Sequence, residues 1–285
     1  MAGQTETFAT GAGRAADLTA ENYRFLQEHL YNASGIILEP GRNHLLEVRL
    51  LPLLREQKLV SLNDLCALLR ATRDPVVSRH VVEAMTTNET LFFRDAHPFQ
   101  ALKSELLPSL VELHKDTRKL AFWSAACATG QEAYSLSMLL LEMGLADWNI
   151  QILGTDLNQQ VVEKARAARY SQLEVNRGLP AQYLVKYFTR QGQDWELKPE
   201  VKRFTKFETF DLRSGMAHLG PFDFVFCRNV LIYFDVPTKK KILEGIRGTL
   251  FRGGHLLLGS AETTIHLDDR FRPRSIGSSV FYQAP

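Results

Sequence analysis

A nine-residue string at 86–94 gathers several side chains that are suited to binding a polar ligand. It reads Thr-Thr-Asn-Glu-Thr-Leu-Phe-Phe-Arg. Asn88 and Thr90 can hydrogen-bond a polar group, and Arg94 carries a planar guanidinium that can hold an anion in a fixed orientation. Alone, the string is also typical of a helix end that runs into a loop. Further polar strings along the chain fit the same site, and they favour a ligand-binding segment.

The string at 120–134 has the pattern of a strand, a turn of small residues and a helix. Ala126, Ala128 and Gly130 lie in the expected turn. In doubly wound sheets this turn passes beneath a nucleotide, because small residues let the backbone approach the ligand. The G-x-G-x-x-G pattern is missing, which disfavours a dinucleotide and suits a nucleoside without phosphates. A plain tight turn is the structural alternative.

Carboxylates end two of the expected strands. Asp156 stands at the tip of one, where an acidic residue can accept hydrogen bonds from both ribose hydroxyls. The structural alternative for Asp156 is to cap the following helix, a role for which Asn158 competes. Asp211 ends another strand and can accept a hydrogen bond from an adenine amino group.

The string at 226–234, Phe-Cys-Arg-Asn-Val-Leu-Ile-Tyr-Phe, ends a further strand. Arg228, Asn229 and Tyr233 are expected at the C-terminal edge of the sheet, where such folds bind ligands. Packing alone does not explain an Arg at the end of a buried strand, because desolvating an unpaired Arg is costly. The structural alternative is that Arg228 pairs with a nearby carboxylate such as Glu132.

Two kinds of periodicity predict the elements that position these residues. Four helices are expected up to about Met85; Pro52 should kink or divide the second, and Ser61 with Asp64 should start the third as a capping box. Beyond Arg94, strands alternate with helices, which indicates a parallel sheet covered on both faces. The expected strands are 120–124, 150–155, 207–212, 222–227 and 255–259, and the expected helices are 132–143, 158–169 and 238–250. One or two antiparallel edge strands are expected within 271–282, and a small antiparallel insertion at about 187–208.

Composition and charge exclude several classes of protein. The 285 residues are 45% hydrophobic and 23% charged, with a formal net charge of +2, which is ordinary for one or two globular domains. The small net charge and the absence of a long Lys/Arg block disfavour binding to nucleic acid. No apolar run approaches the roughly 20 residues of a membrane span. Three widely spaced cysteines favour a reducing compartment and disfavour a zinc site. The expected location is the cytoplasm, with no metal.

Four of these strings occur here in one order: Thr-Asn-Glu-Thr-Leu-Phe-Phe-Arg, Ser-Ala-Ala-Cys-Ala-Thr-Gly-Gln-Glu-Ala-Tyr-Ser, Gly-Thr-Asp-Leu-Asn and Phe-Cys-Arg-Asn-Val-Leu-Ile-Tyr-Phe. From about Leu18 to the C-terminus, the chain resembles the chemotaxis receptor methyltransferases of the CheR type. The resemblance implies an all-α N-terminal domain, followed by an α/β domain with a Rossmann-like S-adenosylmethionine-dependent methyltransferase sheet and a small antiparallel β-subdomain. The expected boundaries are a disordered tail at 1–16, the all-α domain at 17–86, a linker that contributes to the cofactor site at 87–99, and the methyltransferase domain at 100–285.

The resemblance also implies roles for individual residues. Arg94 would lie near the methionine end of the cofactor, Glu132 would meet its amino group, and Tyr233 would lie near the methyl acceptor. Arg94, Arg228 and Tyr233 are therefore the expected catalytic residues. The expected cofactor-binding residues are Asn88, Thr90, Arg94, Glu132, Asp156, Asp211, Leu212, Cys227, Arg228 and Asn229.

The implied reaction transfers a methyl group from S-adenosylmethionine to glutamate γ-carboxylates on the cytoplasmic helices of methyl-accepting chemoreceptors, leaving S-adenosylhomocysteine. A glutamate side chain has a pKa of about 4.3 and is already a nucleophile at neutral pH, so no general base is needed. The enzyme must place the carboxylate in line with the methyl and exclude water. The resemblance implies a monomer that associates with membrane-bound receptor arrays.

Other functions would use some of the same residues, and a few positions differ from the pattern of the family. A regulatory module that binds S-adenosylmethionine or S-adenosylhomocysteine without turnover would share most of these residues. A nicotinamide oxidoreductase lacks its glycine fingerprint, and the segment 42–58 is too mixed in charge for a nucleic-acid methyltransferase. Gln131, Ala133 and Asp211 replace residues common in relatives. The turn at 191–195 is short and Lys198-Pro199 interrupts the run after it, which predicts weak or absent docking of a receptor C-terminal pentapeptide.

Overall fold

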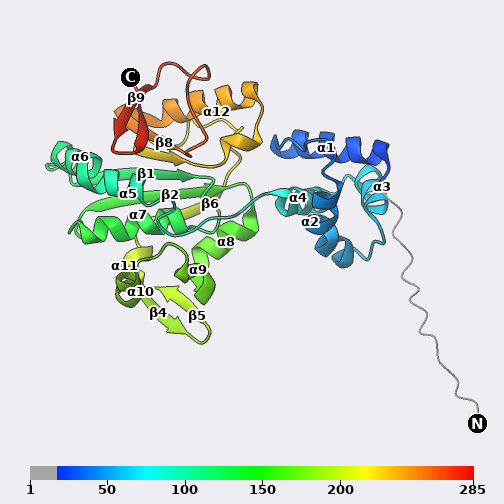
Figure 1. Cartoon of the computed structure of the whole chain (residues 1–285), viewed down its shortest axis with the longest axis horizontal. Helices are drawn as coiled ribbons and strands as arrows, with labels where there is room; N and C mark the ends of the chain where they lie inside the picture. Colours follow the sequence, from blue (N-terminus) through cyan, green and yellow to red (C-terminus); the bar gives the residue numbers. More distant parts are fainter. Residues whose placement is uncertain (1–17) are drawn as a thin grey trace, which may run out of the picture. The chain divides into compact units, whose positions relative to one another are not determined.

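The computed structural model describes residues 18–285, so the tail expected at 1–16 lies outside the described residues. The described chain divides into two compact units. One contains residues 18–33 and 38–85, and the other contains 34–37 and 86–285. In Figure 1 the first is drawn in blue to cyan, and residues 86–285 of the second run from cyan through green to red.

The first unit is all α-helical, as expected. Its helices are α1 (Ala20–Ser34), α2 (Asn43–Glu56), α3 (Leu62–Thr72) and α4 (Pro75–Met85). Their apolar faces meet in a core whose members include Leu26, Leu30, Leu46, Leu50, Leu65 and Val81. Burial of these leucines and valines is the main source of stability for helices of this length.

Two predictions from the sequence concern local features of this unit, the start of α3 and the effect of Pro52 on α2. The capping box that starts α3 is present: the Ser61 side chain accepts from the backbone N–H of Asp64, whose carboxylate accepts from that of Ser61. Pro52 lies inside α2, which continues to Glu56 as one helix, so Pro52 does not divide it, and the alternative of a kink stays a prediction. Proline removes a single backbone donor, and the burial of Leu50, Leu53 and Leu54 around it holds the helix together.

A seven-stranded sheet forms the centre of the second unit. Its strands are β1 (Lys119–Ala125), β2 (Asn149–Asp156), β6 (Thr205–Thr209), β7 (Phe222–Cys227), β8 (Leu250–Leu258), β9 (Arg272–Ile276) and β10 (Ser279–Gln283). They lie in the order β6-β2-β1-β7-β8-β10-β9. The first five are parallel, and β10 and β9 add two antiparallel strands at one edge, as the sequence indicated.

Helices cover both faces of this sheet, as Figure 1 shows. The helical segments of this unit are α5 (His97–Ala101), the π-helical turn η1 (Leu102–Leu106), α6 (Leu107–Leu113), α7 (Gln131–Glu142), α8 (Gln159–Ala167), α9 (Gln172–Asn176), α10 (Ala181–Tyr187), α11 (Pro199–Lys202), the short 3-10 turn η2 (Leu231–Tyr233) and α12 (Val236–Thr249). Alternate residues of β7 enter two separate cores. Phe224 and Phe226 pack with α7, whereas Val225 and Cys227 pack with α12.

Two strand boundaries differ from expectation by three residues or more. Strand β6 ends at Thr209 rather than at 212, because the side chain of Asp211 accepts from the backbone N–H of Arg213 at 2.8 Å and starts a turn. Asp211 and Leu212 therefore follow the strand instead of ending it. Strand β8 begins at Leu250 rather than at 255, and Leu250 pairs with Phe222 ahead of a register shift.

The small antiparallel sheet contains β3 (Arg169–Ser171), β4 (Phe188–Gln191) and β5 (Asp194–Leu197) in the order β3-β5-β4. The insertion expected at 187–208 is therefore incorrect at both ends. It omits β3, which is too short to show a strand pattern, and it includes part of β6, which belongs to the main sheet. Lys198 and Pro199 start α11 and interrupt no strand, so that part of the docking argument is wrong.

Candidate functional site

The main sheet has a switch point between β1 and β7. From β1 the chain proceeds outward through β2 to β6, and from β7 it proceeds the other way through β8. In open sheets of this kind, ligands bind outside the carboxyl ends of the strands at this point. The expected site residues 132, 156, 211 and 228 all follow or end strands at this edge.

The turn between β1 and α7 has a strained backbone that β2 holds in place. Ala126 and Ala128 both have positive φ values, 59° and 47°, in a region that costs a non-glycine residue of the order of 1–3 kcal/mol. The N–H of Cys127 donates to the carbonyl of Thr155 at 2.8 Å, and the N–H of Ala128 donates to Oδ2 of Asp156 at 2.9 Å. The turn thus presents small side chains on a fixed backbone.

Asp156 is only 7% exposed at the end of β2, and burial raises the pKa of its carboxyl. Its Oδ1 accepts from the N–H of Asn158 at 2.9 Å. The cap of α8 is Asn158, whose side chain accepts from the N–H groups of Gln160 and Val161. Asp156 therefore holds the β1 turn instead of capping the helix. The N–H of Leu157 also interacts with this carboxylate, so at least one of its roughly four acceptor positions stays open.

Arg228 follows β7 and forms the pairing that the sequence offered as a structural alternative. Its Nη1 lies 3.0 Å from Oε2 of Glu132 and its Nη2 lies 2.6 Å from Oδ2 of Asp95. Oε1 of Glu132 also accepts from the Ser124 hydroxyl at 2.7 Å. The Arg228 side chain is 3% exposed. Within residues 18–285, its buried Nε has no hydrogen-bond partner.

The segment 86–96 bends sharply where it reaches Arg228. Phe93, Asp95 and Ala96 all have positive φ values. The N–H of Phe93 donates to the Ser135 hydroxyl of α7 at 2.9 Å, and the Arg94 carbonyl accepts from Nη2 of Arg228 at 3.1 Å. The Arg94 side chain donates to the Glu89 carbonyl at 3.2 Å. This segment is therefore fastened to both α7 and the end of β7.

The structure groups some of the expected residues and separates others. Arg94, Glu132 and Arg228 form one connected group, and the Asn88 amide reaches Asn158 through the shared hydroxyl of Thr86. Thr90 is half-buried. The Asp211 carboxylate instead pairs with Arg213 at 2.7 Å.

Three further expected residues lie around the ends of β6 and β7. Leu212 is buried in the same core as Trp123 and the apolar residues of α12. Cys227 is fully buried at the end of β7, and burial raises the pKa of its thiol. Tyr233 is half-buried in η2.

Sequence analysis missed Glu262, which holds the segment after β7. Oε2 accepts from the N–H groups of Asn229 and Gly259, at 2.8 and 2.7 Å, and Oε1 accepts from those of Val230 and Ile232. Asn229 has a positive φ of 57°. A carboxylate that follows Gly-Ser-Ala at the end of β8 was the available signal, but three of its four partners are backbone N–H groups 30 to 33 residues away.

Both parts of the chain match family models. Residues 21–86 match the all-alpha domain of CheR methyltransferases, and residues 88–280 match their SAM binding domain. Chemotaxis protein methyltransferase 1 of Pseudomonas aeruginosa is 38% identical over 269 residues, which are 92% of this chain and 97% of that protein. Chemotaxis protein methyltransferase Cher2 of Pseudomonas putida is 38% identical over 274 residues, 94% of this chain and 98% of that one. The chain therefore belongs to the CheR family of S-adenosylmethionine-dependent chemotaxis methyltransferases.

Proposed function

We propose that this protein transfers the methyl group of S-adenosylmethionine to glutamate γ-carboxylates on the cytoplasmic helices of chemoreceptors, producing glutamate methyl esters and S-adenosylhomocysteine. The observation that carries the proposal is the buried Arg228, which joins Glu132 at the start of α7 to Asp95 and the Arg94 carbonyl across the switch point. The similar Pseudomonas and Vibrio proteins are all named as chemotaxis methyltransferases.

The residues at this edge of the sheet fit S-adenosylmethionine. Small side chains on a fixed turn suit the close approach of a nucleoside, and Asp156 retains an acceptor position for the ribose. Glu132 would accept from the methionine amino group. Among the residues that the structure describes, the buried Oδ1 of Asn229 has no hydrogen-bond partner, which is typical of a ligand site. We assign Asn88, Thr90, Asp211, Leu212 and Cys227 to the surrounding wall.

The charge around Arg228 suits a carboxylate nucleophile. When bound, S-adenosylmethionine supplies an electrophilic methyl group on a positively charged sulfur. A free guanidinium close to the attacking oxygen would lower its nucleophilicity, whereas Arg228 is already paired with Glu132 and Asp95. Arg228 therefore positions the site without quenching the nucleophile. No proton has to move, because the acceptor is ionised at neutral pH.

We assign Arg94 and Tyr233 to orienting the acceptor. The described contact of the Arg94 side chain is a 3.2 Å hydrogen bond to the carbonyl of Glu89, and Arg94 is partly exposed. Such a guanidinium is available to orient a second anion. Tyr233 lies in η2, on the segment that Glu262 holds. We propose that both side chains orient the carboxylate and exclude water.

The proposal extends to domains and location. We assign 17–86 as a receptor-recognising helical domain, 87–99 as a linker that contributes to the cofactor site, and 100–285 as the methyltransferase domain. The protein would act as a cytoplasmic monomer at receptor arrays.

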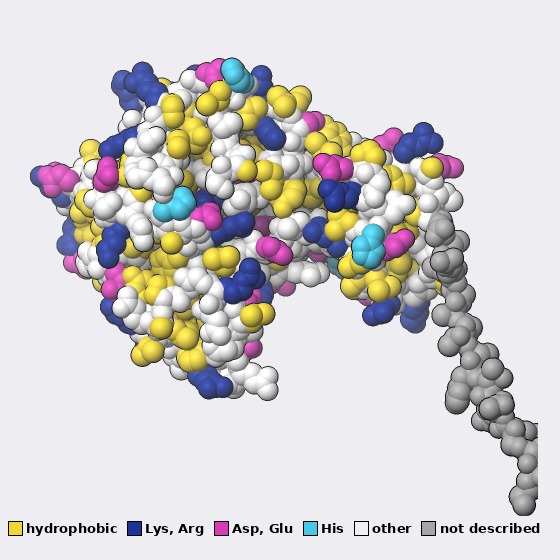
Figure 2. All heavy atoms as spheres, in the orientation of Figure 1, with side chains coloured by type: hydrophobic (Ala, Val, Ile, Leu, Met, Phe, Trp, Pro, Cys, Tyr) yellow, Lys and Arg dark blue, Asp and Glu magenta, His cyan; other side chains and the backbone are white. Residues whose placement is uncertain are grey.

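No helix within residues 18–285 is long and apolar enough to cross a membrane. On the face drawn in Figure 2, Lys and Arg are interspersed with Asp and Glu, which gives no support to nucleic-acid binding.

The test is methyl transfer from labelled S-adenosylmethionine to receptor-bearing membranes of the same organism. Base-labile label on receptor glutamates supports the proposal, because esters hydrolyse in base. Tight binding of S-adenosylhomocysteine without any such label would instead support the non-catalytic regulatory module, which shares the same cofactor-binding residues.

A further inference from the structure

The small antiparallel sheet contacts the turn between β1 and α7 through a buried tyrosine. Tyr170 is the central residue of β3 and is 0% exposed. Its hydroxyl donates to the backbone carbonyl of Thr129 at 2.7 Å. Burial raises the pKa of Tyr170, so the hydroxyl stays protonated and remains a donor. In Figure 1, β4 and β5 of the same sheet lie on the side of the main sheet that α7 and α8 cover.

The acceptor of this hydrogen bond lies in the turn that is assigned to the cofactor. Thr129 follows Ala128, whose N–H donates to the Asp156 carboxylate. It precedes Gly130, the N-cap of α7, which has a positive φ of 91°. A shift of Thr129 would therefore move the backbone that Asp156 holds and also the first turn of α7, which carries Glu132.

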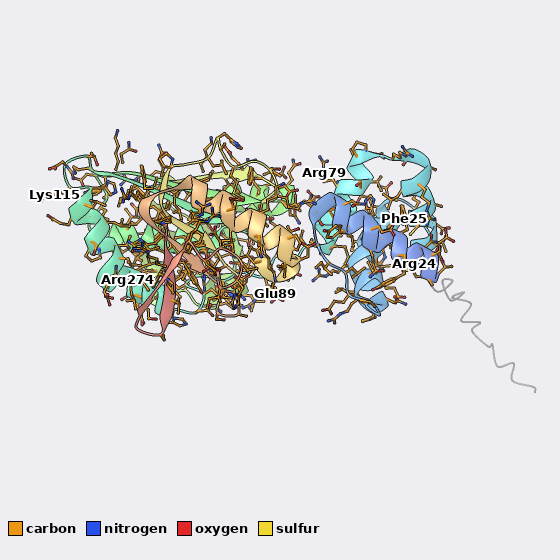
Figure 3. The ribbon with its side chains drawn as sticks, turned by 90° about the horizontal axis from the view of Figure 1, so that it is seen from above. Arg24, Phe25, Arg79, Glu89, Lys115 and Arg274 are labelled. Atoms are coloured by element: carbon orange, nitrogen blue, oxygen red, sulfur yellow. The ribbon has the colours of Figure 1, made fainter. Side chains whose placement is uncertain are left out.

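The ring of the same tyrosine packs against the segment that carries Arg94. The buried ring of Phe92 lies 5.1 Å from that of Tyr170 and 5.7 Å from that of Phe188, centroid to centroid, in edge-to-face arrangements. Phe188 begins β4 of the small sheet. Figure 3 labels Glu89 on this segment. Two strands of the small sheet thus hold Phe92, which is two residues before Arg94.

The loop between α9 and α10 makes a second close contact with segment 86–96. A Cβ at Gly178 would lie 2.0 Å from the carbonyl oxygen of Phe92 and 2.8 Å from Cδ1 of Leu91. Gly178 also has a positive φ of 81°. Both the space and the backbone conformation therefore require glycine here. Because the loop lies directly against the backbone of the segment, a displacement of one displaces the other.

We propose that the small sheet braces the cofactor site and that Tyr170 is the positioning residue of this brace. Its hydroxyl fixes the turn between β1 and α7, and its ring fixes Phe92 of segment 86–96. Because Tyr170 is fully buried, it acts through Thr129 and Phe92 rather than by touching the cofactor. This inference rests on the proposed assignment of that turn and that segment to the cofactor site.

A matched pair of hydroxyl deletions tests this role. Tyr170→Phe and Tyr134→Phe each remove one buried hydroxyl and keep the ring; that of Tyr134 donates instead to the carbonyl of Ala165 in α8, at 2.8 Å. Both variants should lower the melting temperature by similar amounts, because each loses a buried hydrogen bond. Calorimetry should show S-adenosylhomocysteine affinity weakened roughly three- to tenfold in Tyr170→Phe alone, because the cofactor must then order the turn as it binds.

Hydrogen exchange shows where each hydroxyl deletion loosens the chain. In Tyr170→Phe, exchange should accelerate at Cys127 and Gly130, whose N–H groups are hydrogen-bonded in the turn. In Tyr134→Phe it should accelerate at Ala168, whose N–H donates to the same Ala165 carbonyl. Loss of stability in Tyr170→Phe without faster exchange in the turn would show that the hydroxyl does not position it.

A second pair tests the contact between the loop and segment 86–96. Gly178→Ala and Gly192→Ala both add a Cβ at a positive φ, 81° and 65°, but within residues 18–285 the Cβ at Gly192 would meet nothing within 4 Å beyond its neighbours in the chain. Gly178→Ala should weaken S-adenosylhomocysteine affinity at least about threefold, because the displaced segment carries three of the expected cofactor-binding residues. Gly192→Ala should bind as wild type does. Thermal unfolding of each variant shows whether it is folded.

The outcomes separate the inference from the assignments on which it rests. If Asp156→Ala weakens binding while Tyr170→Phe and Tyr134→Phe bind S-adenosylhomocysteine equally, the positioning role of Tyr170 is wrong. A folded Gly178→Ala variant that binds as tightly as Gly192→Ala would also overturn the brace. Unchanged affinity in a folded Asp156→Ala variant would instead reject the cofactor site itself. Failure of wild type to modify any receptor glutamate would reject the proposed function and leave these binding measurements as they are.

Discussion

The guanidinium of Arg228 lies 3.0 Å from the carboxylate of Glu132, although the two residues are 96 positions apart in the chain. This contact joins the end of β7 to the first turn of α7 across the switch point of the sheet. Asp95 binds the other terminal nitrogen of the same guanidinium at 2.6 Å. The two acids thus share one arginine, but only Glu132 is assigned to the cofactor.

Because Glu132 and Asp95 contact the same guanidinium, variants of these two residues form a matched pair. Glu132→Gln and Asp95→Asn each remove one negative charge from Arg228. Because Glu132 should also accept from the methionine amino group, its variant should weaken S-adenosylhomocysteine binding by about 1.5–3 kcal/mol, the contribution of a hydrogen bond to a charged group. Asp95→Asn should weaken it less. Calorimetry in which Asp95→Asn has the larger effect would reject the role given to Glu132.

Glu262 should act as a positioning residue for the segment that carries Asn229 and Tyr233. In Glu262→Gln, one acceptor oxygen becomes a donor amide, and two of the four backbone N–H groups lose their acceptor. Hydrogen exchange at Asn229 and Val230 should accelerate. Turnover should fall at least tenfold, while affinity for S-adenosylhomocysteine changes less.

The control for Glu262 is Asp268→Asn in the same region of the chain. Asp268 is a buried carboxylate that binds Arg247 and Arg270 and makes no contact with the Asn229 segment among the described residues. Its variant should lose about 1–3 kcal/mol of stability but keep wild-type exchange at Asn229. Equal exchange in wild type and Glu262→Gln would contradict the positioning role.

Stability should depend on pH through His255. Its ring is 6% exposed beside Phe224, with no hydrogen bond to either nitrogen among residues 18–285. Burial, assisted by the charge of Arg274, lowers the pKa of His255 from 6.5 to about 4. Between these values the unfolded chain binds more protons, so stability is complete above pH 6.5 and falls as the pH drops toward 4.

The contribution of His255 should be about 2 kcal/mol between pH 7 and 5. His255→Phe, which preserves a ring against Phe224, should remove that part of the slope in urea unfolding. The exposed His266 has a positive φ of 60°, which Asn tolerates, so His266→Asn is the control. A pH slope in His255→Phe identical to that of wild type would show that His255 does not titrate as described.

Docking of a receptor C-terminal pentapeptide should be weak or absent. Strand addition needs a free edge with enough unpaired backbone groups. In the small sheet β5 is central, and the outer strands β3 and β4 have three and four residues. Titration of such a peptide should give no saturation below about 100 μM. Low-micromolar affinity that is abolished by changing the Gly192 turn would contradict this expectation.

Sequence reasoning succeeded where one local pattern decides the structure. The strand 222–227 was predicted to the residue, because six apolar or buried positions lie between two turns. The pairing of Arg228 with Glu132 was considered only as the structural alternative to ligand binding, on the ground that burying an unpaired charge is costly. The fold class and the family could also be predicted, because four chemically distinctive strings occur in one order.

The features that the sequence did not show depend on distant or competing contacts. Strand β6 was extended too far, because Phe210 and Leu212 continue its apolar pattern while the Asp211 side chain turns the backbone. Strand β3 has only three residues. Glu262 was missed because its partners are backbone N–H groups, whose positions depend on the tertiary fold.

The central claim is that this chain methylates receptor glutamates and does not merely bind the cofactor. The most direct measurement is mass-spectrometric mapping of receptor cytoplasmic peptides after incubation with S-adenosylmethionine, for wild type, Arg94→Ala and Tyr233→Phe, alongside S-adenosylhomocysteine affinity for each. We expect methyl esters on glutamate side chains with wild type, and turnover that falls more than cofactor affinity in both variants. Wild-type protein that binds the cofactor yet leaves every receptor glutamate unmodified would contradict the account.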